Sequence, residues 1–198
     1  MPANTTERSE QRSTTELVKA AADGDSRAWD AIVERYSGMV WAVCRGCGLS
    51  RSDAAEVSQT TWLRLVERLA SIHEPDRLGS WLAVTARRES WQVSRRAGRT
   101  IPTDTEATLA DREADDDIDH DILARERQDL LRQAFDSLHP RCQRLLRLLT
   151  ADPAPAYVDV AAALDMPVGS IGPTRARCLQ TLRELLVASG ITGSSSLS

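Results

Sequence analysis

Apolar residues recur at steps of three and four along most of this chain, and that spacing restricts it to an all-α fold. Each such stretch predicts one face of an amphipathic helix, and no stretch of useful length alternates as a strand would. The sequence contains no internal repeat. The predicted helical stretches cover residues 29–47, 52–70, 78–99, 130–138, 145–149, 158–164 and 170–187.

An acidic stretch divides these helices into two groups. Residues 100–127 lack periodicity and contain the run Asp115-Asp116-Asp117, and a run of like charge repels itself and stays extended. We therefore predict two small helical domains joined by a flexible acidic linker. The predicted segments are a mostly disordered N-terminal segment (1–24), a first domain (25–99), the linker (100–129), a second domain (130–188) and a flexible tail (189–198).

Composition and charge exclude several classes of protein. The 198-residue chain has four cysteines, too few for the disulfide framework of a secreted domain. No apolar stretch approaches the roughly 18–20 residues of a membrane span, and the N-terminus carries no signal-peptide core. We therefore expect a cytoplasmic protein without a membrane partner. The net charge is −4 overall, +3 over residues 25–99 and −8 over the linker. This asymmetry points to nucleic-acid contact, although an ordinary solvated surface has the same charges.

The segment 160–171 is typical of a helix-turn-helix. Small Ala161 lets the second helix approach, and Asp165 stands in the turn, where left-handed geometry must be tolerated. We expect Ser170 to cap the second helix, with Pro173 in its first turn. That helix would present polar side chains to a DNA major groove, although a plain three-helix core predicts the same pattern. The candidate DNA-reading residues are Ser170, Thr174, Arg175 and Arg177.

A second candidate site lies at the end of the third predicted helix. Arginines there share one helical face, and Trp91 sits beside them. Clustered arginines neutralise phosphates, and an indole can stack on an unpaired base. Trp91 could equally pack in the core, which is the commoner fate of a tryptophan. The candidate residues are Arg87, Arg88, Trp91, Gln92, Arg95, Arg96 and Arg99.

A third candidate site is the polar face of the second predicted helix. It carries Glu56, Gln59 and Arg64, with Leu63 as an apolar residue among them. Such a mixture suits a protein partner, although single exposed leucines are common.

The cysteines and histidines give no pattern of a metal or catalytic site. Cys44 and Cys47 form a lone C-x-x-C, whereas a structural zinc site needs four ligands and a redox pair needs a βα context. The three histidines have no Ser or Cys partner that the sequence identifies. We therefore predict no catalytic residue, no metal, no cofactor and no enzymatic activity, with Cys44 packed as a small apolar residue.

In their order and spacing these segments together resemble a bacterial RNA polymerase sigma factor of the sigma-70 family, extracytoplasmic-function (ECF) subfamily. Residues 53–65 are similar to the family's D-A-E-D-x-x-Q-x-x-F-L-R-L segment. Trp81-Leu82 followed by 87–99 resembles the segments that recognise and melt the minus-ten element. Residues 138–182 resemble the sigma4 domain, which reads the minus-thirty-five element, except that Gly172-Pro173-Thr174 replaces the family's Lys, Ser and Arg.

The resemblance implies a promoter-specificity subunit with a sigma2-like and a sigma4-like domain. Its partners would be promoter DNA and core RNA polymerase, contacted at the β′ clamp helices and the β flap, and the family also leaves room for an anti-sigma factor. The residues that it assigns to polymerase binding are Asp53, Glu56, Gln59, Leu63 and Arg64.

Three other functions remain open on the residues alone. The chain could be a stand-alone helix-turn-helix regulator with a helical sensor or dimerisation domain. It could be a cytosolic redox or metal protein that uses Cys44 and Cys47. It could also be a helical scaffold with no role in nucleic-acid binding.

Overall fold

The computed structural model describes residues 12–97 and 122–189, without the side chains of 122–127, and all regular structure in those ranges is helical. This confirms the all-α prediction. No helix in the same ranges is long and apolar enough to cross a membrane. The helices are α2 (Thr14–Ala22), α3 (Ser26–Gly46), α4 (Arg51–Arg68), α5 (Leu78–Arg96), α6 (Ile122–Asp136), α7 (Pro140–Leu149), α8 (Tyr157–Leu164) and α9 (Ile171–Ala188), with 3-10 turns at Leu69–Ser71, Pro75–Arg77 and Val168–Ser170.

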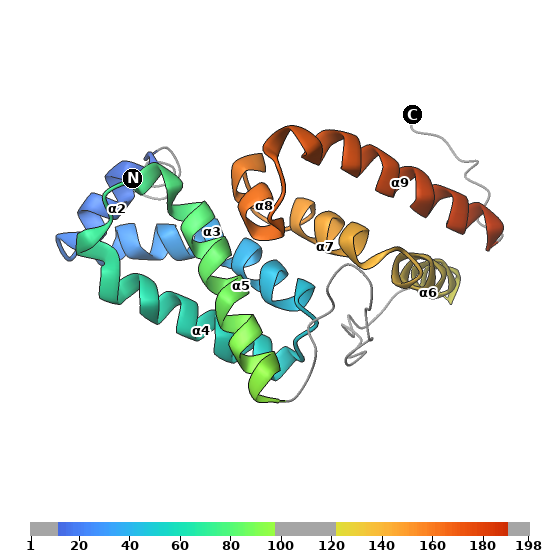
Figure 1. Cartoon of the computed structure of the whole chain (residues 1–198), viewed down its shortest axis with the longest axis horizontal. Coiled ribbons are helices and arrows are strands. Elements are labelled where there is room, and N and C mark those ends of the chain that lie inside the picture. The colour runs from blue at the N-terminus through green and yellow to red at the C-terminus, as the bar shows by residue number, and fades with distance from the viewer. Residues whose placement is uncertain (1–11, 98–121, 190–198) are drawn as a thin grey trace, which may run out of the picture.

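Helices α2 to α5 pack into one bundle, in which α3 contacts each of the other three (Figure 1). The apolar stripe of α3 supplies Ile32 and Val40 to its centre, and both are fully buried. Leu65 of α4 and Leu82 of α5 are buried against them. Removal of each such side chain from water stabilises the fold by about 1.5–3 kcal/mol. The predicted apolar stripes therefore form the core of this bundle.

Helix α2 corrects the expectation that residues 1–24 are mostly disordered. The Ser13 hydroxyl accepts the Glu16 N–H at 3.2 Å, and the Glu16 carboxylate accepts the Ser13 N–H at 2.8 Å. This capping box satisfies two backbone donors that an uncapped helix would leave unpaired. Leu17 and Val18 are buried against α3 and its neighbours. Residues 14–22 therefore belong to the bundle, while residues 1–11 lie outside the described residues.

The start of α4 also differs from the sequence-based prediction. The helix begins at Arg51, and the Ser50 hydroxyl caps it by accepting the Asp53 N–H at 3.1 Å. Asp53 and Glu56 have the three-residue spacing of a capping box, which predicts a cap at Asp53. This prediction is wrong, because Asp53 already lies in the first turn. A serine before the helix has the extended backbone that lets its side chain reach these amides.

The boundaries of the predicted linker also change. Helix α6 begins at Ile122, inside the stretch 100–129 that we expected to be extended. Helix α5 ends at Arg96 rather than at Arg99. The acidic run lies within residues 98–121, outside the described residues.

The helix-turn-helix geometry of α8 and α9 agrees with the sequence at its turn. Asp165 adopts the left-handed conformation (φ 55°, ψ 53°), and Pro173 lies in the first turn of α9. The predicted cap by Ser170 is wrong. Its backbone is helical, and its hydroxyl donates to the Pro167 carbonyl at 2.7 Å instead of accepting from an α9 amide.

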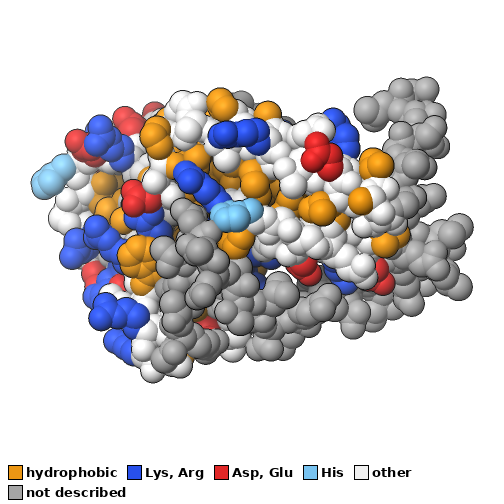
Figure 2. Space-filling model, turned by 45° about the vertical axis from the view of Figure 1, so that its right-hand side comes forward, with side chains coloured by type: hydrophobic (Ala, Val, Ile, Leu, Met, Phe, Trp, Pro, Cys, Tyr) orange, Lys and Arg blue, Asp and Glu red, His pale blue; other side chains and the backbone are white. Residues whose placement is uncertain are grey.

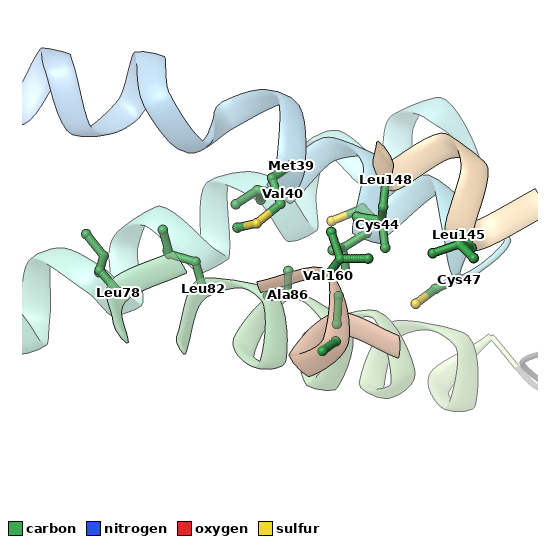
Figure 3. Close-up of a cluster of buried hydrophobic side chains, with 14 of the residues drawn as sticks. Met39, Val40, Cys44, Cys47, Leu78, Leu82, Ala86, Leu145, Leu148 and Val160 are labelled. Carbon is green, nitrogen blue, oxygen red and sulfur yellow. The ribbon is translucent and has the colours of Figure 1, made fainter. Parts of the chain in front are cut away.

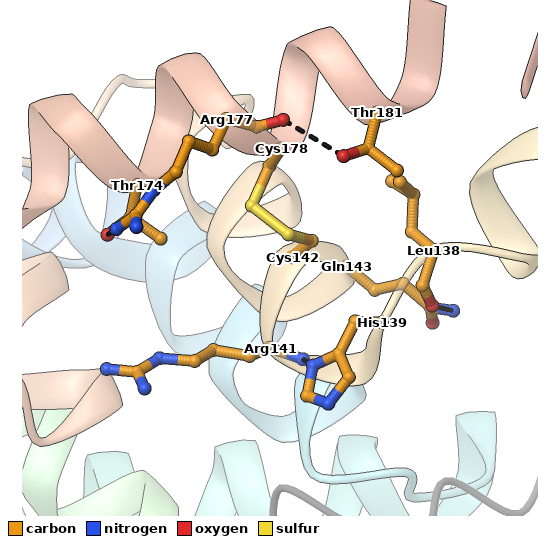
Figure 4. The surroundings of a disulfide bond; sticks show 9 residues. All are labelled: Leu138, His139, Arg141, Cys142, Gln143, Thr174, Arg177, Cys178 and Thr181. Carbon is orange, nitrogen blue, oxygen red and sulfur yellow. Dashed lines mark hydrogen bonds between the residues drawn. A yellow bond between two sulfur atoms is a disulfide. The ribbon is translucent and has the colours of Figure 1, made fainter. Parts of the chain in front are cut away.

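A disulfide joins Cys142 of α7 to Cys178 of α9, across a separation of 36 residues (Figure 4). Sequence reasoning did not pair these cysteines. Beside the disulfide, Gln143 closes the α6–α7 turn, because its side-chain amide donates to the Asp136 and Leu138 carbonyls at 2.9 Å. Helix α9, the second helix of the helix-turn-helix, is thus covalently fixed to α7.

The two groups of helices share one buried core. Helix α8 packs against α5 and α7 packs against α3, so the C-terminal helices lie directly on the N-terminal bundle (Figure 1). Leu145 and Leu148 of α7 and Val160 of α8 point between α3 and α5 in Figure 3. All three are buried.

Candidate nucleic-acid interface

The C-terminal half of α5 carries the basic face that its sequence predicts. Ser90 and Ser94 are buried on the side that faces the bundle, and the Ser90 hydroxyl donates to the Ala86 carbonyl at 2.7 Å. The opposite side carries exposed polar residues that can meet a phosphate backbone. They are Arg88, Gln92, Arg95 and Arg96. Arginine side chains gather on the left of the face drawn in Figure 2, which belongs to the N-terminal bundle. Arg99 lies outside the described residues.

Arg87 does not share this exposed face. Only 18% of its side chain is exposed, and its guanidinium donates to the Ala163 carbonyl of α8 at 3.3 Å. The same group lies 3.9 Å from the Asp165 carboxylate in the helix-turn-helix turn. The structure therefore directs one predicted DNA-binding residue toward the C-terminal half of the chain.

Trp91 is half exposed, at 48% of its surface, so it is not the core residue that a tryptophan usually is. The Arg87 guanidinium lies 5.5 Å from the centroid of its ring, at cation–π distance. Trp81, by contrast, is partly buried and packs against the bundle core. One indole on α5 is therefore accessible next to the basic face.

Helix α9 exposes Arg175 and Arg177, while Thr174 is half-buried. The Arg177 guanidinium lies 3.5 Å from the Thr174 hydroxyl, at the limit of a hydrogen bond. Thr174 and Arg177 lie three residues apart and so share one face of α9, whereas Arg175 lies on nearly the opposite side of the helix from Arg177. Ser170 lies beside them, just before the helix begins.

The polar face of α4 is exposed and has an apolar centre. Leu63 is 58% exposed. The apolar spacing of this helix predicts Val66 at the edge of the buried stripe, but Val66 is 54% exposed beside Leu63. The Arg64 guanidinium reaches Glu67 at 3.4 Å and Glu89 of α5 at 3.6 Å, so it links this face to the helix with the basic face. Glu56 and Gln59 are exposed and Asp53 is half-buried on the same helix.

The C-x-x-C cysteines lie inside the core, away from these faces. Cys44 and Cys47 are both buried free thiols. Burial raises the pKa of Cys44 to about 12 and also raises the pKa of Cys47. Among the side chains of residues 12–97 and 128–189, no three His, Cys, Asp or Glu form a group that could hold a metal ion. The surroundings are thus those of apolar packing residues.

One segment of this chain matches a known protein family. Residues 32–100 match the family described as Sigma-70 region 2, a range that begins in α3 and includes all of α4 and α5. The basic face of α5 and the polar face of α4 both lie within it. No curated protein matches the sequence of this chain.

Among solved structures, the chain is similar to the one described as "Structure of CnrH in complex with the cytosolic domain of CnrY". The two are 20% identical, with a TM-score of 0.55 over 87% of this chain and 96% of that chain. At this identity the likeness concerns the fold, which extends over both groups of helices.

Proposed function

We propose that this chain, whose residues 32–100 match the family described as Sigma-70 region 2, is a sigma factor that binds core RNA polymerase and directs promoter-specific initiation of transcription. The observation that carries the proposal is this match, because it includes both the accessible basic face and the mixed polar and apolar face. The helix-turn-helix at the other end of the chain supplies a second element for reading DNA. We assign the chain to the extracytoplasmic-function subfamily and to the cytoplasm on the motifs that it resembles.

Polymerase binding would fall to the exposed face of α4. Leu63 and Val66 provide an apolar centre of the kind that carries binding energy in protein interfaces. A charged and polar rim surrounds them. Such a rim determines the orientation of the bound partner more than the affinity of binding. The proposed contact residues are Asp53, Glu56, Gln59, Leu63 and Arg64, toward the β′ clamp helices.

Recognition and opening of the minus-ten element would fall to α5. The exposed arginines neutralise the phosphates of the non-template strand, and Trp91 stacks on an unpaired base. Opening of the strands in this way requires no covalent chemistry, because the held bases stabilise the open state and the polymerase makes the bonds. The proposed residues are Arg87, Arg88, Trp91, Gln92, Arg95, Arg96 and Arg99.

Recognition of the minus-thirty-five element would fall to α9. Its first turns would enter the major groove, with Arg175 and Arg177 nearest to base edges and phosphates. Ser170 and Thr174 would add hydroxyl contacts. Because Gly172, Pro173 and Thr174 replace the family's polar residues, the preferred sequence should differ from that of relatives that retain them.

A regulatory protein is a further proposed partner. The solved structure with a similar fold contains the cytosolic domain of a second protein, CnrY. We propose by analogy that an anti-sigma factor binds this chain and that its release frees the faces described above.

The polymerase face provides a direct test of the proposed function. Leu63→Asp places a charge in the apolar centre, and Leu131→Asp places the same charge on α6, where Leu131 is 46% exposed. We expect Leu63→Asp to weaken binding to core polymerase at least tenfold, about 1.4 kcal/mol, and Leu131→Asp to leave it unchanged. Co-purification and fluorescence anisotropy with labelled protein measure both. Wild-type protein that binds duplex DNA but never binds core polymerase would instead support a stand-alone regulator.

A further inference from the structure

The four cysteines form two pairs with opposite surroundings. Cys44 and Cys47 are free thiols inside the core, exposed by 0% and 7%, and burial raises the pKa of both. Thiols that stay protonated in apolar surroundings react slowly with oxidants. Cys142 and Cys178 are instead joined in a disulfide, with their Cα atoms 5.4 Å apart (Figure 4). This second pair connects two helices, so its oxidation state affects how those helices are held together.

The two joined cysteines differ in their access to solvent. Cys142 is half-buried and is the third residue of α7, and the first turn of that helix contains no acidic residue. Cys178, in the middle of α9, is only 1% exposed. The start of a helix carries a partial positive charge, and the exposed Arg141 precedes Cys142, so both charges favour a thiolate at this position. Cys142 is therefore the sulfur that a reagent reaches first, and Cys178 is its buried partner.

Helix α9 has few other buried contacts. Of its eighteen residues, Ile171 and Cys178 are buried, and the leucines further along it that pack on the core are only partly buried. In the sequence these two residues stand on either side of the segment that carries Thr174, Arg175 and Arg177. Ile171 fixes the start of this segment, and the disulfide fixes its end to α7. Reduction therefore removes the covalent anchor from one end of the DNA-reading segment.

A permanent disulfide does not suit the compartment that the proposed function implies. Cytoplasmic thiols are kept reduced, and the disulfides that form there are usually transient and catalytic or respond to oxidants. We propose that Cys142 and Cys178 form a reversible redox site, in which a hydroperoxide forms the disulfide and the disulfide holds α9 on α7 in the arrangement that reads duplex DNA. The site itself depends on the geometry of the two cysteines, whereas its effect on promoter recognition rests on the proposed function.

The oxidation takes place in two steps. The Cys142 thiolate attacks one peroxide oxygen and breaks the O–O bond, which gives a sulfenic acid on Cys142 and releases water or an alcohol. Cys178 then attacks the Cys142 sulfur, the S–S bond forms, and hydroxide leaves as water with the proton of the Cys178 thiol. Two thiols and one hydrogen peroxide thus give one disulfide and two waters, and the two sulfurs supply the two electrons. In the reverse direction a protein dithiol attacks the accessible Cys142 sulfur and releases the Cys178 thiol.

The first test follows each cysteine of the full-length chain by peptide mass spectrometry. The reduced chain is freed of reductant and treated with hydrogen peroxide. We expect a disulfide between Cys142 and Cys178, while Cys44 and Cys47 remain thiols and serve as internal controls. Thioredoxin with its reductase should then reduce the disulfide in the folded chain. A disulfide that does not form, that forms no faster than Cys44 and Cys47 are oxidised, or that resists thioredoxin overturns the redox site.

Two matched variants test which sulfur reacts with the peroxide. In Cys178→Ala the sulfenic acid on Cys142 has no partner, so it should accumulate and be trapped by dimedone. In Cys142→Ala the buried Cys178 should be trapped at least about tenfold more slowly. Circular dichroism checks that both variants are folded. Equal trapping at the two positions contradicts the assignment of Cys142 as the reacting sulfur.

The effect on α9 is measured on the oxidised and the reduced full-length chain. We expect the amides of residues 171–188 to exchange hydrogen at least about tenfold faster after reduction, while those of α3 and α4 keep their rates. A fluorescent duplex of random sequence should bind at least about threefold more weakly to the reduced chain, because a smaller fraction of α9 is in the binding arrangement. A Cys142→Ala/Cys178→Ala variant should behave as the reduced chain with and without peroxide.

Equal exchange rates in α9, or equal duplex affinity in the two redox states, overturns the proposed effect of the disulfide. All these measurements use the free chain without polymerase. A failure of the redox site is therefore distinguishable from a failure of promoter-selective transcription in both redox states, which would overturn the proposed function.

Discussion

Reduction of the Cys142–Cys178 disulfide should destabilise the C-terminal helices by an amount that the chain separation sets. The bond closes a loop of 36 residues between α7 and α9. A cross-link over such a loop removes about 13 cal/mol/K of chain entropy from the unfolded state, or about 4 kcal/mol at 25 °C. Domains of this kind have total stabilities of about 5–15 kcal/mol, so the loss should be large.

Urea unfolding of the full chain with and without a dithiol reductant measures this loss. We expect the free energy of unfolding of the C-terminal helices to fall by about 3–4 kcal/mol on reduction. A Cys142→Ala/Cys178→Ala variant should start at the reduced value and show no response to reductant. Cys44 and Cys47 cannot mimic the effect, because they are free thiols in the oxidised protein.

An unchanged unfolding midpoint on reduction would refute this reasoning. It would mean either that the unfolded chain retains the α7–α9 contact or that the two cysteines are not joined. Free-thiol counting on the denatured chain separates the two explanations, because two thiols are expected with the disulfide and four without it.

The remaining predictions concern single side chains. Arg175→Ala and Arg177→Ala should each lower the slope of log affinity for promoter duplex against log salt by about 0.9, as loss of one phosphate contact requires; anisotropy over a NaCl series measures this, and an unchanged slope contradicts the contact. Trp91→Ala should leave duplex binding unchanged but remove permanganate reactivity in the open complex, because stacking on an unpaired base is worth about 1–3 kcal/mol; normal opening would make the role of Trp91 structural. Cys44 should resist alkylation in the folded protein at pH 8, because with its pKa raised to about 12 only about one thiol in ten thousand is ionised. Peptide mass spectrometry compares it with the guanidinium-unfolded chain, and equal rates would reopen a redox role.

Much of the fold follows from local patterns in the sequence. The apolar stripe of α3 and the left-handed Asp165 are fixed by residues within one or two turns of each other. Helix α2 has only nine residues and two buried side chains, too few for apolar spacing to predict it. Its capping pair, Ser13 and Glu16, is the signal that would have revealed it.

The contact between the halves could not be predicted from periodicity. Val160 and Leu145 have the same helical spacing whether they pack within their own domain or on α3 and α5. Gly79 alone does not indicate this contact. A glycine is needed there because a Cβ would overlap the carboxylate of Asp159 in α8, eighty residues further along the chain. Long-range pairing of this kind appears only once the helices are placed.

In the candidate site, too, local patterns predict the side chains of one helix but not the contacts between distant helices. Arg88, Gln92, Arg95 and Arg96 are exposed on one face as the sequence predicts, because a helix fixes which side chains point together. Arg87 is turned toward Ala163 and Asp165 by a contact that no local pattern indicates. The pairing of Cys142 with Cys178 likewise depends on how α7 and α9 cross.

Run-off transcription in vitro shows whether this chain directs RNA polymerase to particular promoters. Purified full-length chain is added to bacterial core RNA polymerase that lacks any other sigma factor, together with a library of promoter fragments. A sigma factor should give transcripts from a small subset of fragments that share two spaced elements, and Leu63→Asp should abolish them. Folded protein that gives no selective transcript with any bacterial core enzyme would contradict the proposed function.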